Sequence, residues 1–137
     1  MAFADPQKGR SVICGPGPAA SMVTLAGTCV EGDILGYSSG WKRALGTAAS
    51  VINPQLVALK GGLSGDVIPV ALVCVVTGYT GGTAGGLIYV AEGADSGKVT
   101  DTIPTTQSDL VTVIGVLLDA TTIAFNLTNV QVVHALA

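Results

Sequence analysis

Charged side chains are scarce in this chain of 137 residues. Asp, Glu, Lys and Arg together make up 11% of the sequence, whereas 49% of the residues are hydrophobic. Globular proteins average about 25% charged residues. A surface with so little charge predicts that neighbouring molecules cover a large part of it.

Cations are few as well, and they form no basic stripe. The sequence has six Lys and Arg against nine Asp and Glu, which gives a net charge of −3. Lys42 and Arg43 are the only two cations adjacent to each other. Nucleic-acid binding needs clustered positive charge, so the composition predicts no nucleic-acid partner.

Long apolar runs are missing too. The mean hydropathy is +0.63, but the longest apolar run, Val67 to Val76, contains Pro69 and falls well short of the ~20 residues that cross a bilayer. The N-terminus has no basic stretch followed by an apolar one, so no secretory signal is visible. We therefore expect synthesis in a cytoplasm and no membrane partner.

Cysteine and histidine are rare. Cys14, Cys29 and Cys74 are odd in number and widely spaced, which fits neither a disulfide framework nor a CxxC zinc site. We expect buried free thiols in a reducing compartment. One histidine, His134, and scattered aspartates form no cluster of metal ligands, so we expect no metal and no cofactor.

The residues that are abundant indicate β-structure. Short β-branched runs alternate with Gly, Asp, Ser and Pro, which is typical of antiparallel strands, and helix formers other than Ala and Leu are scarce. The sequence therefore predicts an all-β fold, a small antiparallel barrel or sandwich. We expect a hairpin over 32–44, a strand within 55–60 and one long strand over 66–77, buried on both faces or in an interface.

A weak internal repeat accompanies this pattern. Gly85-Gly86-Leu87-Ile88 matches Gly32-Asp33-Ile34-Leu35, which lies 53 positions earlier. Each half reads as a hairpin, a variable middle and a long strand. The sequence predicts one β domain over 22–137, built from two related halves of about 27–78 and 81–134 with internal pseudo-symmetry.

Residues 1–21 form a separate segment. Gly15-Pro16-Gly17-Pro18 prevents a regular element, because proline lacks a backbone donor and glycine has no conformational preference. Two interpretations stay open, a floppy terminus or an extended arm that becomes ordered on a neighbouring subunit. Trp41 similarly fits either an interface anchor or packing over its own hairpin.

The candidate residues for protein interaction lie in this arm, in the first hairpin and near the C-terminus: Phe3, Pro6, Arg10, Pro16, Pro18, Trp41 and Val132.

One stretch carries a possible catalytic motif. Gly36-Tyr37-Ser38-Ser39-Gly40 fits the G-x-S-x-G nucleophile elbow of hydrolases. That elbow needs a helix directly after the serine and a parallel sheet with crossover helices, which residues 41–46 and an all-β chain do not supply. Gly97-Lys98 resembles a P-loop but lacks its first glycine and its Ser or Thr. We therefore expect no catalytic residue and no enzyme. A small serine hydrolase using Ser38 is the least favoured alternative.

Four runs in the second half of the chain carry a family resemblance: Gly85–Val90, Gly97–Thr102, Val113–Leu118 and Thr122–Asn126. They resemble small structural proteins of tailed bacteriophages, namely head decoration, cement or capsid-fibre proteins. The family pattern is a G-x-x-V-Y-x-x-x-G-x-V-T-x-A hairpin followed by an x-x-G-V-A strand. This chain departs from that pattern at Asp101 and at Leu117.

The resemblance implies a barrel or tulip-like module that sits on the outer surface of the virion capsid after synthesis in the host cytoplasm. Such modules commonly form homotrimers, clamp neighbouring capsomers of the major capsid protein and carry no catalytic residues. Strand addition by 22–25 or 130–136 to a neighbouring sheet is one route to such contacts. A phage tail or fibre module is the alternative, because it shares these motifs.

Overall fold

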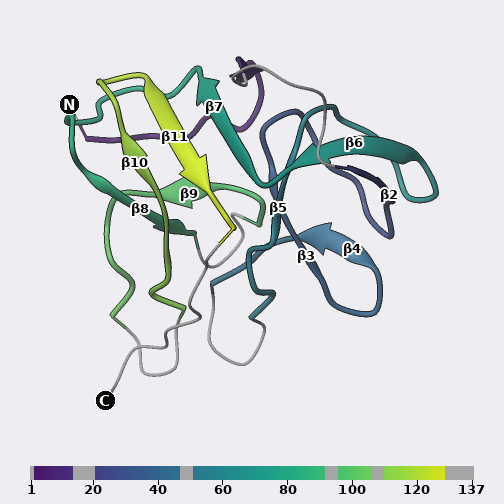
Figure 1. Cartoon of the computed structure of the whole chain (residues 1–137). Coiled ribbons are helices and arrows are strands. Elements are labelled where there is room, and N and C mark those ends of the chain that lie inside the picture. Colours follow the sequence, from purple (N-terminus) through teal and green to yellow (C-terminus); the bar gives the residue numbers. More distant parts are fainter. Residues whose placement is uncertain (1, 14–20, 47–50, 92–95, 106–109, 129–137) are drawn as a thin grey trace.

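The computed structural model of the chain describes residues 2–13, 21–46, 51–91, 96–105 and 110–128. Within these ranges the secondary structure consists of eleven β-strands and no helix, which confirms the all-β prediction. It follows that the described residues contain no helix long and apolar enough to cross a membrane. The strands form two antiparallel sheets (Figure 1).

The first sheet has five strands in the order β2-β6-β5-β3-β4. Its strands are β2 (Ser21–Thr24), β3 (Ile34–Tyr37), β4 (Trp41–Arg43), β5 (Leu56–Ala58) and β6 (Val67–Ala71). Leu25, just after β2, forms a bridge with Trp41 of β4, and Ala26 N donates to Trp41 O at 2.8 Å. The two outermost strands therefore meet, and the sheet curls around a small core that includes Leu35 and Ile68.

The second sheet has six strands in the order β1-β7-β11-β10-β8-β9. Its strands are β1 (Ser11–Val12), β7 (Val73–Thr77), β8 (Leu87–Val90), β9 (Val99–Thr100), β10 (Val113–Leu117) and β11 (Thr122–Asn126). The larger core lies where this sheet meets the first one. Ile34 and Val57 of the first sheet pack there in one cluster with Val76, Ile88 and Phe125 of the second.

The apolar stretch over 66–77 is two strands and not one. It breaks at Leu72, so that β6 belongs to the first sheet and β7 to the second. Side chains alternate along both strands: Val70 and Cys74 are buried in different cores, whereas Val67 and Val73 are each 57% exposed. The prediction of one long strand is therefore wrong, because the chain changes sheets in its middle, and so is its burial on both faces within the chain.

Both sheets use the same connection order. If β2–β6 are counted as the first repeat and β7–β11 as the second, the strands of each repeat lie side by side in the order first, fifth, fourth, second, third. Thr24 pairs with Val67 in the first repeat, and Thr77 pairs with Thr122 at the same place in the second. The boundary between the repeats is Leu72, earlier in the chain than the expected break between 78 and 81.

The turn that precedes the second strand is also shared. Gly32 and Gly85 both have φ of 86°, a left-handed value that glycine adopts without steric cost. Gly32 N donates to Ala58 O and Gly85 N donates to Leu117 O, each at 2.8 Å. The sequence match that starts at these two glycines therefore corresponds to one backbone geometry used twice.

Gly36 in β3 tests how closely the first sheet packs. A Cβ atom at this position would lie 2.0 Å from the backbone oxygen of Asn53. We expect Gly36→Ala to lower the free energy of unfolding by about 3 kcal/mol in urea titrations, because backbone atoms must move. In the matched control Gly27→Ala the nearest atom is Lys42 Cγ at 3.9 Å, and we expect a change below about 0.5 kcal/mol. Equal stabilities would contradict this packing.

Candidate interaction surface

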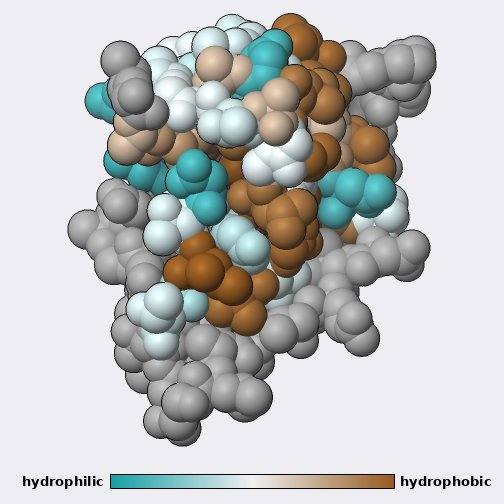
Figure 2. All heavy atoms as spheres, turned by 90° about the vertical axis from the view of Figure 1, so that its left-hand side faces the viewer, coloured by the Kyte–Doolittle hydropathy of each residue, from teal (hydrophilic) through white to brown (hydrophobic). Residues whose placement is uncertain are grey.

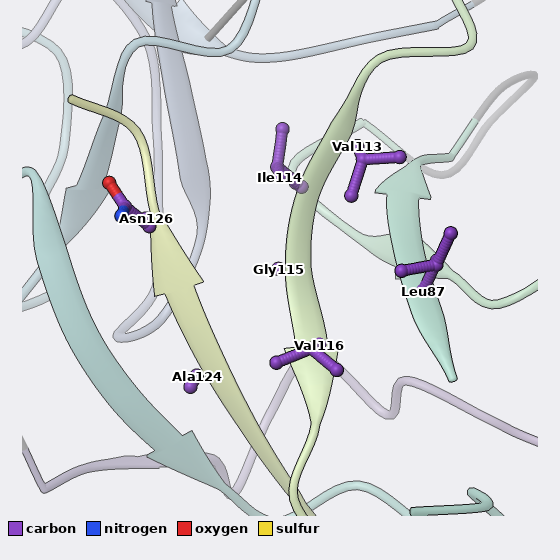
Figure 3. Close-up of a pocket in the computed structure, with 7 residues that line it drawn as sticks. All are labelled: Leu87, Val113, Ile114, Gly115, Val116, Ala124 and Asn126. Carbon is purple, nitrogen blue, oxygen red and sulfur yellow. The ribbon is translucent and has the colours of Figure 1, made fainter. Parts of the chain in front are cut away.

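A shallow apolar groove crosses the outer face of the six-stranded sheet. Seven residues of β8, β10 and β11 line it: Leu87, Val113, Ile114, Gly115, Val116, Ala124 and Asn126 (Figure 3). None of the seven is charged, and the side chains of Leu87 and Val113 leave 48% and 45% of their residue surfaces exposed. The groove can therefore bind a partner through apolar contact.

The local structure of β10 shapes this groove. Its pairing with β8 changes register between Val113 and Gly115, an irregularity of the β-bulge type that re-aims side chains. Figure 3 shows Val113 and Leu87 on neighbouring strands at one side of the groove and Ala124 at the other. A Cβ atom on Gly115 would lie 2.8 Å from Ala124 O. Gly115 pairs with Phe125, whose side chain is buried in the core, so the missing side chain lies on the core face of the sheet and lets β10 and β11 approach closely there.

The apolar character extends beyond the groove. Figure 2 views the molecule from the left-hand side of Figure 1 and shows a band of hydrophobic side chains bordered by hydrophilic ones. Further large hydrophobic side chains are exposed elsewhere on the molecule: Ile13, Met22, Tyr37, Leu63, Val67, Leu72, Val73, Ile103 and Leu118. Each represents apolar area that a partner can remove from water, at roughly 25 cal/mol per Å².

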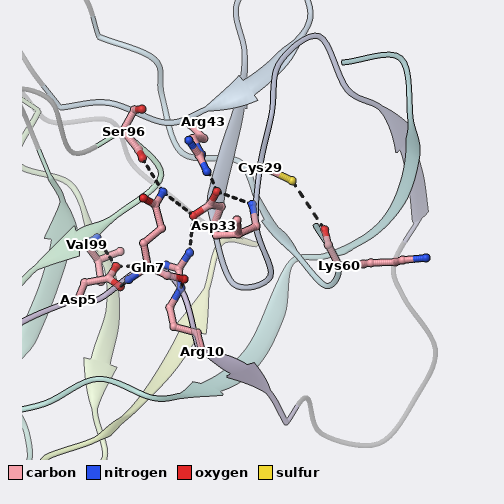
Figure 4. Close-up of polar contacts among 10 residues, drawn as sticks. Asp5, Gln7, Arg10, Cys29, Asp33, Arg43, Lys60, Ser96 and Val99 are labelled. Atoms are coloured by element: carbon pink, nitrogen blue, oxygen red, sulfur yellow. Dashed lines mark hydrogen bonds and ion pairs between the residues drawn. The ribbon is translucent and has the colours of Figure 1, made fainter. Parts of the chain in front are cut away.

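A cluster of buried charges holds the N-terminal segment against this body (Figure 4). The carboxylate of Asp33 is fully buried at the start of β3. It accepts hydrogen bonds from the guanidinium of Arg10, from Arg43 Nε at 2.7 Å and from Gln7 Nε2 at 3.0 Å. The other side of the Arg10 guanidinium donates to Asp5 Oδ2 at 3.1 Å.

Asp5 has bonds of its own to the second sheet. Its Oδ2 atom accepts a hydrogen bond from Val99 N at 3.0 Å, and its Oδ1 atom accepts one from Gln7 N at 2.8 Å. Burial raises the pKa of the Asp5 carboxyl, and the positive charge of Arg10 together with these backbone donors opposes that rise. Two carboxylates and two guanidiniums thus share one interior site, with each Asp facing a cation.

Residues 2–13 are ordered on their own chain. The ring of Phe3 stacks on Tyr79 with centroids 5.8 Å apart, Ala4 bridges to Thr80, and β1 pairs with β7. The segment turns at 7–9, where Gln7 and Gly9 have φ of 63° and 81°. Over residues 2–13 it packs on its own chain, so these residues are neither a floppy terminus nor an arm placed on a neighbouring subunit. Residues 14–20, which include Pro16 and Pro18, lie outside the described residues, as does Val132.

The remaining candidates for protein interaction differ in where the structure places them. Arg10 is only 4% exposed and bonds inside the molecule, so the structure contradicts its expected place at a contact surface. Phe3 is half-buried and Pro6 is exposed. Trp41 packs edge-on against Tyr37 with ring centroids 5.4 Å apart. This contact corresponds to the second of the two interpretations of Trp41, packing over its own hairpin. Trp41 also borders a second, more polar hollow.

Ser38 does not lie in a nucleophile elbow. It sits in the turn between the antiparallel strands β3 and β4, with Ser39 at φ of 56° and Gly40 at φ of 127°. The G-x-S-x-G pattern is therefore a hairpin turn in this chain, without the strand-to-helix context of a hydrolase. Among the described residues, no group of three or more His, Cys, Asp or Glu could hold a metal ion.

Sequence reasoning missed two features, the apolar groove and the buried carboxylate of Asp33. The groove residues were not singled out, because alternation marks two faces of a strand without saying which one is covered. Asp33 was noted only as part of a repeat, although a carboxylate next to an apolar strand in a charge-poor chain is a signal that it needs buried partners.

No protein-family model, no curated protein and no solved structure matches the chain. The fold and the groove define an all-β protein of two antiparallel sheets with a charge-poor outer surface.

Arg10 provides a test of the buried cluster. We expect Arg10→Met to lower the free energy of unfolding by about 3–5 kcal/mol, because Asp5 and Asp33 lose a buried cation. The measurement is urea unfolding at neutral pH. Lys8→Met removes an exposed charge two residues away and should change the stability by less than about 0.5 kcal/mol. A small effect of Arg10→Met would show that the N-terminal segment is held by other contacts.

The thiols provide a second test. Burial raises the pKa of the Cys29 thiol to about 11, and Cys29 and Cys74 are 3% and 1% exposed. Since the thiolate is the reactive form, we expect both residues to resist alkylation at mildly alkaline pH in the folded protein and to react rapidly in denaturant. Peptide mapping by mass spectrometry resolves each position. Rapid native labelling of Cys29 would contradict its burial.

Proposed function

We propose that the chain is a virion structural protein that binds the outer surface of a phage capsid as a decoration or cement protein. In this role it stabilises the shell by bridging neighbouring capsomers. The observation that carries the proposal is the large uncharged apolar area on the outside of both sheets. The sequence resemblance to phage head proteins supports the same assignment.

The proposed capsid contact lies on the first repeat. Met22 and Val67 are 55% and 57% exposed on the neighbouring strands β2 and β6. Met22 pairs with Pro69, which lies two residues from Val67, so the three side chains share one face of the sheet. We name Met22, Val67 and Pro69 the first-repeat patch. A partner that covers it gains apolar burial without having to desolvate a charge.

Such a contact suits a cement protein because its stabilising effect depends on the apolar area that each copy buries and on the number of copies on the shell. Association costs several kcal/mol per copy in lost motional freedom, so only part of the apolar gain remains as affinity. A modest net gain is repeated at every position of the shell and adds up against internal pressure. The proposal makes the major capsid protein the partner, assigns no catalytic role to Ser38, and includes self-association as a homotrimer.

Mixing the purified protein with expanded shells assembled from the major capsid protein tests the proposal. We expect co-sedimentation and, by electron microscopy, copies distributed over the whole outer surface. Density confined to one vertex would favour the tail or fibre module instead. A protein that does not bind the shells at all would refute the proposal.

A variant of the first-repeat patch tests whether this patch contacts the shells. We expect Val67→Lys to weaken binding to the shells by about tenfold or more, because a lysine charge must be desolvated in the contact. Ile103→Lys adds the same charge at an exposed residue of the second repeat that does not line the groove, and it is the matched control, expected to bind the shells as the wild type does. The bound fraction at several protein concentrations measures both. Equal binding by wild type and Val67→Lys would remove the patch from the contact.

A further inference from the structure

One face of the first repeat packs against the second repeat inside the chain. Ile34 of β3 and Val57 of β5 are cross-strand neighbours and both are 0% exposed. They pack in one cluster with Val90, Val99 and Leu110 of the second half. The face around the Ile34–Val57 pair is therefore buried by another repeat of the same fold.

The second repeat has the same pair at the same place. Leu87 of β8 and Val116 of β10 are cross-strand neighbours, and Leu87 follows Gly85 by two residues as Ile34 follows Gly32. The backbone bonds of these two glycines to the neighbouring strand are alike, at 2.8 Å in both repeats. The pair Leu87–Val116 thus corresponds to the pair Ile34–Val57.

The two equivalent pairs differ in their surroundings. Leu87 is 48% exposed, and both Leu87 and Val116 line the apolar groove. Within the described part of the chain, the second repeat is followed by no third repeat that could cover this face. The groove is consequently the second copy of a surface that, in the first repeat, is an internal interface.

From this equivalence we infer that the groove is the docking surface for a second copy of this chain. The occupant follows from the first repeat, where the corresponding face packs against a repeat of the same fold. The seven lining residues carry no charge, so an uncharged apolar surface of the kind this chain offers fits without desolvating an ion. The proposed function includes self-association, and this inference, which rests on that part of the proposed function, assigns the groove as the surface through which the copies bind.

Self-association of the purified protein, without any capsid, tests this assignment. Light scattering after size-exclusion chromatography across a dilution series gives the mass of the species. We expect the wild type to form an oligomer that dissociates on dilution. We expect Leu87→Lys and Val113→Lys to raise its dissociation constant by about tenfold or more. Both side chains are about half exposed in the single chain, so the variants should keep the melting temperature of the dilute, monomeric wild type.

Val67→Lys is the matched control, because it adds the same charge at an exposed valine of the first repeat and should leave the oligomer unchanged.

A second experiment measures how far the groove is covered in the oligomer and does not need a variant that weakens the contact. A thiol introduced by Val113→Cys should react more slowly with a maleimide in the oligomer than after dilution, whereas one introduced by Val67→Cys should react equally in both.

Three results would overturn the inference. These are a wild type that stays monomeric at all concentrations, an oligomer that Leu87→Lys leaves intact, and a Val113→Cys thiol that is equally reactive in both states. Shell binding is measured separately with Val67→Lys. A wild type that binds the shells but does not self-associate therefore refutes this inference alone, and a wild type that self-associates through the groove but does not bind the shells refutes the cement function alone.

Discussion

One buried carboxylate constrains the whole arrangement. Asp33 accepts hydrogen bonds from Arg10 in the N-terminal segment, from Arg43 on β4 and from Val30 N at 2.8 Å. A buried charge is costly unless all its partners are present, so these parts of the chain must assemble together. The second repeat takes part as well, because a Cβ atom on Gly97 would lie 2.9 Å from the Asp33 carboxylate. Only a bare backbone fits there.

The two repeats share a backbone and have diverged in what they present. Asp33 N donates to Val30 O at 3.1 Å, and at the equivalent place Gly86 N donates to Thr83 O at 2.9 Å. The first repeat thus carries the carboxylate that fixes the interior, whereas the second carries no side chain at all. The N-terminal segment bonds to this carboxylate through Arg10 and also pairs with β7 and with Val99 of the second repeat, so it ties the two repeats together.

In the proposed function, each repeat contributes a different contact surface. The first-repeat patch and the groove lie on different repeats, so one chain can contact a shell and a second copy through separate surfaces. Both surfaces act by removing apolar area from water, and neither depends on an ion pair, so salt should affect them little.

The sequence by itself determined the local structure. β-Branched runs between Gly and Ser turns predicted the all-β fold and the hairpin around 38–40, because strand and turn preferences depend on neighbouring residues. It did not reveal the break at Leu72, which no Gly or Pro marks, or the pairing of Arg10 with Asp33 across 23 positions. Nor could it distinguish Ile34, buried, from Leu87, exposed. Both are apolar strand residues after the same turn, and only the packing of one repeat against the other decides which of them meets water.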